Sequence, residues 1–107
     1  MVPQISVAAT RDWLLDPRDT PLLLDVRETW EVAIASLPDA QHIPMGQLVA
    51  RVAEIDTSRS VIVFCHHGIR SLQVVAFLQR QGFDDVHNLT GGIDAWSKII
   101  DNNIALY

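Results

Sequence analysis

The sequence predicts an α/β fold in which helices cover both faces of a mainly parallel central sheet. Two apolar runs, PLLLDV at 21–26 and SVIVFC at 60–65, are continuous rather than alternating in polarity, as strands buried on both faces are. Amphipathic helical patterns separate these runs from three weaker strand candidates, and such alternation is typical of parallel βα units. With 107 residues, 49% of them hydrophobic, the chain suffices for one shared core. We therefore expect residues 1–107 to form a single domain.

Strand and helix patterns alternate along the whole chain. In chain order, the expected strands are 4–6, 21–26, 41–44, 60–65 and 85–89, and the expected helices are 7–15, 28–35, 46–55, 70–82 and 91–100. Ser6 can cap the first helix, because a serine side chain accepts a hydrogen bond from a free amide of the first turn. The helix at 70–82 has the clearest apolar period, and Gly82 is placed to end it. Trp96 is expected in the core, and the tail at 101–107 is expected to pack back along the domain.

Composition and charge exclude several classes of function. The formal net charge is −5 and the eight lysines and arginines are scattered, so no basic surface for nucleic acid is expected. The longest apolar stretches have four to five residues, far below the ~20 that cross a membrane. One cysteine cannot form an internal disulfide, and the first residues lack the pattern of a signal peptide. We therefore expect a cytoplasmic protein, a monomer or weak dimer, without nucleic-acid or membrane partners.

The only cysteine, Cys65, stands where the most apolar strand ends, in the segment CHHGIRS at 65–71. In open α/β sheets, ligands bind beyond the carboxyl ends of the strands. Gly68 allows a tight turn there, and a helix that begins near Arg70 directs backbone N–H groups inward, which makes a cradle for an anion. Helix N-termini and nearby cations lower a thiol pKa into the range ~3.5–7.5. The pattern therefore favours a nucleophilic thiolate.

Two other roles for these residues compete with nucleophilic catalysis. A lone cysteine at the end of a strand is most often a small buried hydrophobe, but the pattern Cys-x-x-Gly-x-Arg-Ser between a strand and a helix favours catalysis or anion binding. His66 or His67 would add positive charge when protonated. Because adjacent residues point in different directions, we expect at most one of the two to face the site. A metal site built from Cys65 and these histidines is not expected, since no further ligands follow at a familiar spacing.

Three segments together resemble the rhodanese superfamily of sulfurtransferases, specifically its small single-domain members. LLLDVRETWE at 22–31 is similar to the N-terminal signature of the family, CHHGIRS at 65–71 to its active-site loop, and GFDDVHNLTGGIDAWSK at 82–98 to its C-terminal signature. The segments follow the order of the family and span almost the whole chain. The resemblance therefore implies a single rhodanese-like domain.

The resemblance also implies a reaction. Cys65 takes the sulfane sulfur of thiosulfate, releasing sulfite, or of another persulfide donor, and becomes a persulfide. The outer sulfur then passes to a nucleophile, which is cyanide in vitro and a thiol or protein acceptor in a cell; no cofactor and no metal are implied. A persulfide places its outer sulfur about 2 Å beyond the cysteine sulfur, within reach of the loop amides, and Arg70 offsets the charge. The residues expected to bind it are His66, His67, Gly68, Ile69, Arg70 and Ser71.

Loop length separates this chemistry from phosphate chemistry. In the related dual-specificity phosphatases and arsenate reductases of this fold, five residues lie between the cysteine and the arginine, and the wider loop holds a tetrahedral oxyanion. In this chain, four residues separate Cys65 from Arg70. By this resemblance the loop suits one sulfur atom, and sulfur transfer is favoured over phosphatase activity.

Two further segments bear on the resemblance. ASLPDA at 35–40 departs from the family pattern, which commonly runs Gly-His-Ile-Pro-Gly-Ala: Ser36 stands at the place of the histidine and Asp39 at that of the second glycine. The resemblance therefore does not imply the local geometry there. Charged residues around the end of the strand at 21–26 are interpreted as structural support, an ion-pair brace rather than catalytic groups. They are Asp25, Arg27 and Glu31.

A second function, from a different class, stays open. The same fold can serve as a sulfur carrier or as a sensor module dedicated to one protein partner, with little turnover on small donors. The presence of Cys65 and Arg70 favours activity of some kind, because a purely structural relic needs neither. The sequence is nearly silent on the donor, so a small sulfur-donor anion and a protein persulfide both stay candidates.

Overall fold

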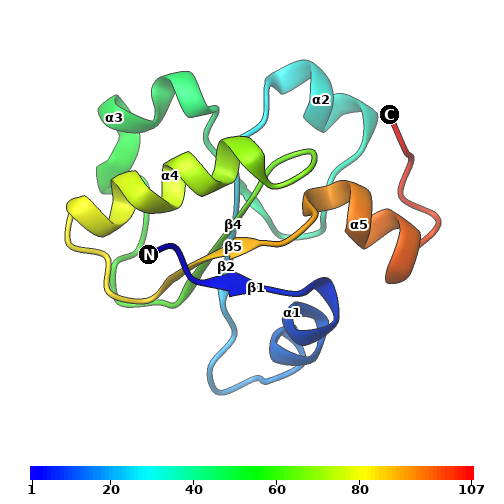
Figure 1. Ribbon diagram of the computed structural model, residues 1–107, viewed down its shortest axis with the longest axis horizontal. Helices are drawn as coiled ribbons and strands as arrows, with labels where there is room; N and C mark the ends of the chain where they lie inside the picture. Colours follow the sequence, from blue (N-terminus) through cyan, green and yellow to red (C-terminus); the bar gives the residue numbers. More distant parts are fainter.

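Five parallel strands form the central sheet of the computed structural model, which describes residues 1–107 (Figure 1). The strands are β1 (Gln4–Ile5), β2 (Leu22–Asp25), β3 (Gln41–His42), β4 (Val61–Phe64) and β5 (Val86–Leu89). They lie in the order β1-β5-β4-β2-β3, and every neighbouring pair runs parallel. The predicted parallel sheet is confirmed, with the two most apolar strands, β2 and β4, next to each other in its interior.

Helices connect the strands: α1 (Val7–Leu14), α2 (Thr29–Ile34), α3 (Leu48–Arg51), α4 (Ile69–Arg80) and α5 (Gly92–Ile99). Two 3₁₀ turns, Met45–Gln47 and Val52–Glu54, flank the short α3, so the continuous helix predicted over 46–55 is wrong. Only Leu48 and Ile55 of that segment are buried, and a helix with so little packing surface gains little over tighter turns. None of the helices has the length and apolar character that a membrane crossing requires.

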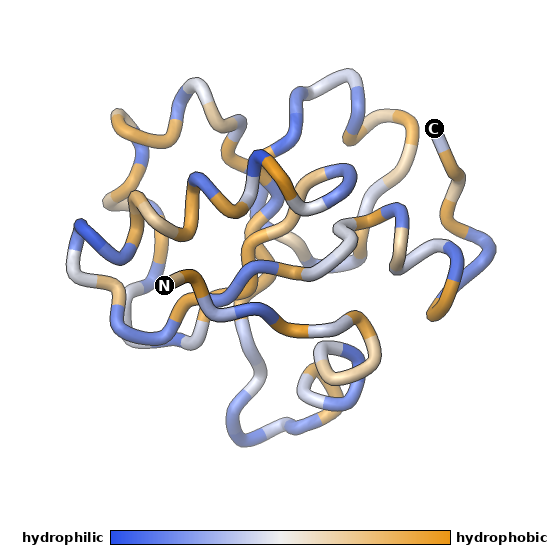
Figure 2. Tube along the Cα trace, in the orientation of Figure 1, coloured by the Kyte–Doolittle hydropathy of each residue, from blue (hydrophilic) through white to orange (hydrophobic).

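Two groups of buried residues cover opposite faces of the sheet. Because successive side chains of a strand point to opposite faces, Leu24 of β2 packs in one group and Leu23 in the other. The first group includes Leu48 of α3 and Val74, Val75 and Leu78 of α4, and the second includes Val7 of α1 and Ile93 and Trp96 of α5. Helices therefore cover both faces, as predicted (Figure 1). Figure 2 shows hydrophobic residues gathered along the central strands.

Local signals in the sequence place several helix ends correctly. Ser6 caps α1, since its Oγ accepts a hydrogen bond from the N–H of Ala9 at 3.1 Å. Gly82 follows α4 with a φ of +96°, a conformation that glycine adopts without strain. Trp96 is 7% exposed and belongs to the second core group, so its predicted place in the core is confirmed.

The order of the strands creates a topological switch point beside β4. From β2 the chain moves to the neighbouring β3, whereas from β4 it moves to β5 on the other side. Ligands of parallel sheets bind beyond the carboxyl ends of the strands at such a reversal. Asp25 and Phe64, the last residues of β2 and β4, are partners in the register. The segments that follow these two strands therefore lie at one edge of the sheet, and Cys65 lies at this edge.

Candidate active site

The turn between β4 and α4 is built around Gly68. Its φ is +98°, and it directly precedes the first residue of α4, so this helix begins at Ile69, one residue earlier than predicted. A Cβ atom at Gly68 would lie 3.2 Å from the carbonyl oxygen of Leu89 and 3.3 Å from the nitrogen of Gly91. Both the backbone conformation and the close approach to the segment after β5 therefore favour glycine.

The sulfur of Cys65 is enclosed by hydrogen-bond donors from this turn. The residue is 1% exposed, and its Sγ accepts hydrogen bonds from the N–H of Gly68 at 3.1 Å and the N–H of Ser71 at 3.4 Å. The Ser71 hydroxyl lies 3.3 Å from the same sulfur. Burial raises the pKa of Cys65, but hydrogen bonds from Ser71 and Gly68 outweigh it, so the thiol pKa lies below its ordinary value. The surroundings suit a sulfur anion.

Four further backbone N–H groups of the loop have no partner within the protein. They belong to His66, His67, Ile69 and Arg70. An amide N–H without a protein partner can bind water or an anion. The sequence predicts a ring of donors over residues 66–71. The structure divides it into two amides that already reach Cys65 and four that stay available to a ligand.

The guanidinium of Arg70 is held by a carboxylate rather than by the sulfur. Its two terminal nitrogens donate to the two oxygens of Glu31, at 2.7 Å each. Hydrogen bonding from Arg70 lowers the pKa of Glu31 to about 2, although burial opposes the shift, so the ion pair is formed at neutral pH. The charge of Arg70 still favours a sulfur anion, but it is the smallest of the causes that lower the pKa of Cys65, and Glu31 balances it.

Asp25 and Arg27 form a fully buried ion pair, consistent with the structural role expected of them. Arg27 is 0% exposed, and its Nε and one terminal nitrogen donate to the two oxygens of Asp25 at 2.9 and 2.6 Å. Its other N–H groups donate to the carbonyl oxygens of Glu31 and Ala35 and to the hydroxyl of Tyr107. All five guanidinium donors therefore have acceptors, which compensates the buried charge. The pair ties the end of β2 to α2.

His66 and His67 stack on each other, so the prediction that they point in different directions is wrong. Their ring centroids are 3.9 Å apart, and the ring of Tyr107 lies 3.8 Å from that of His66, parallel to it within 6°. His66 is thus enclosed between two rings. Burial lowers its pKa, which disfavours the positive charge expected from this loop.

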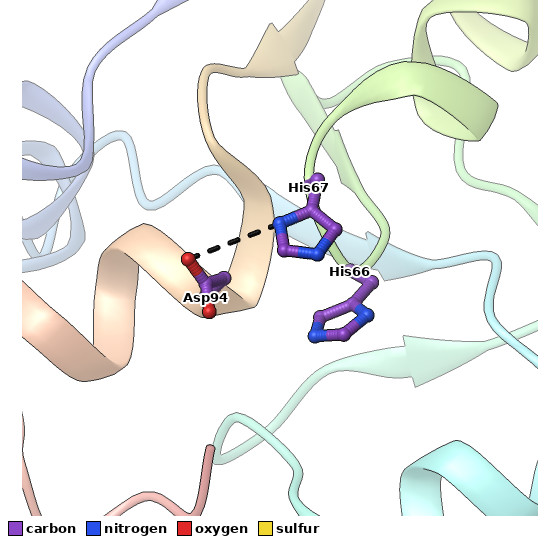
Figure 3. Close-up of side chains that lie close together, drawn as sticks. All are labelled: His66, His67 and Asp94. Carbon is purple, nitrogen blue, oxygen red and sulfur yellow. Dashed lines mark ion pairs between the residues drawn. The ribbon is translucent and has the colours of Figure 1, made fainter. Parts of the chain in front are cut away.

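Asp94 of α5 lies beside the two histidines (Figure 3). One possible ligand atom from each of the three residues lies within 4.8 Å of the others. An imidazole binds a metal at about 2 Å along a lone pair that lies in the plane of its ring. The stacked rings of His66 and His67 differ by only 27° in plane, so one ion cannot lie in both planes at that distance. Asp94 pairs most closely with Lys98, at 2.9 Å, and its carboxylate also lies 3.8 Å from Nδ1 of His67, the contact dashed in Figure 3. The arrangement does not suit a metal.

The start of α5 supports the loop through its backbone. The N–H groups of Ile93 and Asp94 donate to the carbonyl oxygens of Cys65 and His66, both at 3.0 Å. Gly92 has a φ of +61°, and a Cβ atom on it would lie 2.5 Å from both of these oxygens. The paired glycines of the segment at 82–98 therefore allow the N-terminus of α5 to pack directly against the loop.

The segment at 35–40 keeps a left-handed residue without glycine. Asp39 has a φ of +62° and is the only non-glycine residue with a positive φ. Aspartate adopts this conformation more readily than most residues do. Asp39 therefore meets the requirement at the position where the family commonly has glycine, and Ser36 is exposed. The departure from the family pattern is accommodated locally.

Sequence reasoning missed two residues at the site, Asn88 and Tyr107. Asn88 of β5 is 2% exposed and accepts a hydrogen bond from the hydroxyl of Ser71. Its sequence signal was weak, because the strand VHNL at 86–89 holds two polar residues, His87 and Asn88, and only the structure shows that Asn88 is the buried one. Tyr107 accepts a hydrogen bond from Arg27 and donates one to Glu31, 80 and 76 residues earlier in the chain. No local pattern marks it, but the expectation that the tail packs back along the domain is confirmed.

Comparison with known proteins identifies the family of this chain. Residues 10–99 match the family model described as the rhodanese-like domain. A sulfurtransferase from Allochromatium vinosum is 40% identical over 98 residues, which cover 92% of this chain and 91% of that protein. The putative sulfur carrier protein YrkF from Bacillus subtilis is 32% identical over 96 residues, which cover 90% of this chain and 51% of that protein.

A solved structure extends the likeness to three dimensions. The crystal structure of a rhodanese-like domain protein from Staphylococcus aureus aligns with a TM-score of 0.85 and 26% identity, covering 99% of both chains. The family match spans most of this chain, and its relatives support sulfur transfer at the level of the family. The loop after β4, the sheet order and these matches agree with one another, and the chain belongs to the rhodanese-like domain family.

Proposed function

We propose that this protein is a sulfurtransferase in which Cys65 carries the transferred sulfur as a persulfide. The observation that carries the proposal is the surroundings of the sulfur. Backbone N–H groups of Gly68 and Ser71 donate to it from the turn before α4. Burial raises the pKa of Cys65, but hydrogen bonds from Ser71 and Gly68 outweigh it, so the thiol pKa is lowered. A thiolate held by dipoles is a ready nucleophile.

The reaction runs in two displacement steps. With thiosulfate as donor, the Cys65 thiolate attacks the outer sulfur, a new sulfur–sulfur bond forms, and the sulfur–sulfur bond of the donor breaks as sulfite leaves with the electron pair. A nucleophile then attacks the outer sulfur of the persulfide, and the Cys65 thiolate leaves. Cyanide gives thiocyanate, whereas a thiol or a protein acceptor gives a new persulfide. Neither step needs a cofactor.

The unpaired amides of the loop support the persulfide state. The outer sulfur lies about 2 Å beyond Sγ, and four N–H groups of the same loop, from His66, His67, Ile69 and Arg70, have no protein partner and can bind an anion. Preorganised dipoles stabilise an anion without a counter-charge. Four residues separate Cys65 from Arg70, which favours one sulfur atom over the tetrahedral phosphate of the related phosphatases.

A second candidate function is that of a sulfur carrier or sensor for one protein partner, with little turnover on small donors. The pairing of Arg70 with Glu31 favours it, because a neutralised arginine attracts a small dianion such as thiosulfate less than a free one does. The likeness to a putative sulfur carrier points the same way. Donor and acceptor would then be a protein persulfide and a protein thiol.

Intact-protein mass spectrometry tests the covalent step. Protein incubated with thiosulfate is expected to gain the mass of one sulfur atom, and added cyanide is expected to remove it. Cys65→Ser, a nearly isosteric change, is the control and is expected to gain nothing while it keeps the fold. The same gain in Cys65→Ser would exclude the proposed role of the cysteine. Loading from a protein or glutathione persulfide, without loading from thiosulfate, would favour the carrier.

A further inference from the structure

The side-chain amide of Asn88 lies next to the loop and has a forced orientation. It is buried on β5, with one terminal atom 3.1 Å from the carbonyl oxygen of Gly68 and 3.0 Å from Oε1 of Gln4. A backbone carbonyl oxygen only accepts hydrogen bonds, so the atom that faces Gly68 is the Nδ2 donor. The amide oxygen of Asn88 therefore faces the hydroxyl of Ser71.

The hydroxyl of Ser71 has one hydrogen and two neighbours that compete for it. Oδ1 of Asn88, 2.5 Å away, only accepts. The sulfur of Cys65, 3.3 Å away, donates as a thiol but only accepts as a thiolate. With the thiol, both contacts are satisfied, because S–H donates to Ser71 and Ser71 donates to Asn88. Once the thiol proton has left to solvent, the hydroxyl can donate to the sulfur only by breaking its bond to Asn88.

We propose that Asn88 is a positioning residue that acts on Cys65 through Ser71, holding the hydroxyl hydrogen away from the sulfur until the sulfur becomes an anion. Asn88 thereby opposes ionisation of the thiol. If the hydroxyl turns to the sulfur, the buried Oδ1 loses its partner, which costs free energy. If the hydroxyl does not turn, an oxygen lone pair faces the thiolate. The proposed role of Asn88 concerns the ionisation of Cys65 alone. Only the consequence for the rate of sulfur transfer rests on the proposed function.

Charged and titratable groups surround the loop on several elements. They are Arg70 on α4, Glu31 on α2, Asp25 at the end of β2 with Arg27 after it, Asp94 on α5, His66 and His67 in the loop, and Tyr107 in the tail. None of them forms a hydrogen bond with the side chain of Asn88 or Ser71. They are unchanged in Asn88→Leu and Ser71→Ala, so a difference between these variants reports on the shared hydrogen.

A double-mutant cycle at Asn88 and Ser71 tests the proposal, with the ultraviolet absorbance of the thiolate followed against pH. The chain has one cysteine, so the thiolate signal belongs to Cys65. Asn88→Leu removes the acceptor at nearly constant size and frees the hydroxyl hydrogen for the sulfur. The pKa of Cys65 is then expected to fall by about one unit, the size of one hydrogen bond to a charged group. In the Ser71→Ala background, Asn88→Leu is expected to leave the pKa nearly unchanged.

Asn88→Asp is the matched control. It keeps an acceptor oxygen beside Ser71, and a carboxylate there adds a negative charge that disfavours the thiolate, so on both grounds the pKa of Cys65 is not expected to fall. An unchanged or raised pKa in Asn88→Leu overturns the proposal, and so does a fall that persists in the Ser71→Ala background. Circular dichroism checks the fold, and Asn88→Ala takes the place of Asn88→Leu if leucine disturbs β5. The readout uses no sulfur donor, so its failure is distinguishable from a failure of sulfur loading.

Discussion

Two groups of polar atoms lie side by side at the carboxyl edge of the sheet, and they stabilise charge in different ways. Around Cys65 the polar atoms are dipoles: two backbone N–H groups donate to the sulfur, and four more have no partner in the protein. Beside the loop lies a charge cluster made of Asp25, Arg27, Glu31 and Arg70. In that cluster, each guanidinium has a carboxylate partner at 2.6 or 2.7 Å.

The comparison shows which of the two groups of polar atoms can still bind an added anion. Charges that are paired within the protein contribute orientation and stability, and they attract an added anion little. Amides without partners keep their capacity for a negative atom, and they need no reorganisation when it forms. The loop around Cys65 therefore owes its affinity for a sulfur anion to backbone geometry. The charge cluster holds β2, α2 and α4 in the positions that this geometry needs.

Removing a buried charge should have the largest effect on stability. We expect Arg27→Met to lower the free energy of unfolding by about 3–5 kcal/mol, because Asp25 is left buried without a counter-ion. Urea denaturation followed by circular dichroism measures the change. The double variant Asp25→Asn with Arg27→Met should recover part of the loss, since no unpaired charge remains. A loss below about 1 kcal/mol would place the pair among ordinary surface ion pairs and break the comparison.

A methyl group at Gly92 tests whether the backbone N–H groups around Cys65 must keep their positions. Gly92→Ala is expected to lower the free energy of unfolding by about 2–3 kcal/mol, because the added Cβ meets two carbonyl oxygens of the loop in a left-handed conformation. Sulfur loading of Cys65 should slow as well, since the loop must shift. Gly46→Ala is the matched control, because a Cβ there has nothing within 4 Å. Equal loading rates in both variants would show that the loop geometry tolerates displacement.

The smallest expected effect is also the most dependent on pH. The pKa of Glu31 is about 2 in the folded protein against an ordinary 4.5, so its ion pair stabilises the fold fully above pH 4.5. That contribution is lost as the pH falls from 4.5 toward 2. Glu31→Gln should cost about 1–2 kcal/mol at neutral pH and remove this part of the acid dependence of unfolding. Urea denaturation at several pH values measures both.

Glu54→Gln provides the control for this acid profile. Glu54 pairs with Arg51 on the exposed surface, where solvent screens the attraction, so its loss should leave stability at neutral pH almost unchanged. If Glu31→Gln showed the same acid dependence as the unmodified protein, Arg70 would not be held through the charge of Glu31.

The sequence predicted most of the fold because its signals there are local. Continuous apolar runs marked β2 and β4, and the serine at position 6 and the glycine at position 82 marked helix ends. The segment at 46–55 failed, because its helical pattern lacked buried partners to stabilise it. Hydrophobic periodicity decides an element only when enough of its apolar residues are buried along its whole length, and between Leu48 and Ile55 this segment has none.

The site was predicted in part. The pattern around Cys65 located the turn and the donors, since a glycine between a strand and a helix restricts the backbone strongly. Long side chains were not predicted: Arg70 reaches Glu31, 39 residues away in the chain, and Tyr107 reaches it from 76 residues away. The stacking of His66 between His67 and Tyr107 was not predicted either, since Tyr107 comes from the far end of the chain.

By itself the sequence determined which residues can react: one cysteine at the end of an apolar strand, followed by a glycine turn and a helix, within the signatures of one family. Only the tertiary structure decided the protonation chemistry around that cysteine. It paired Arg70 with Glu31, and it set Asn88 against Ser71. The physical reason is range, because backbone turns follow from neighbouring residues, whereas the partner of a charge or of a hydroxyl hydrogen depends on which distant segments the fold brings within 3 Å of it.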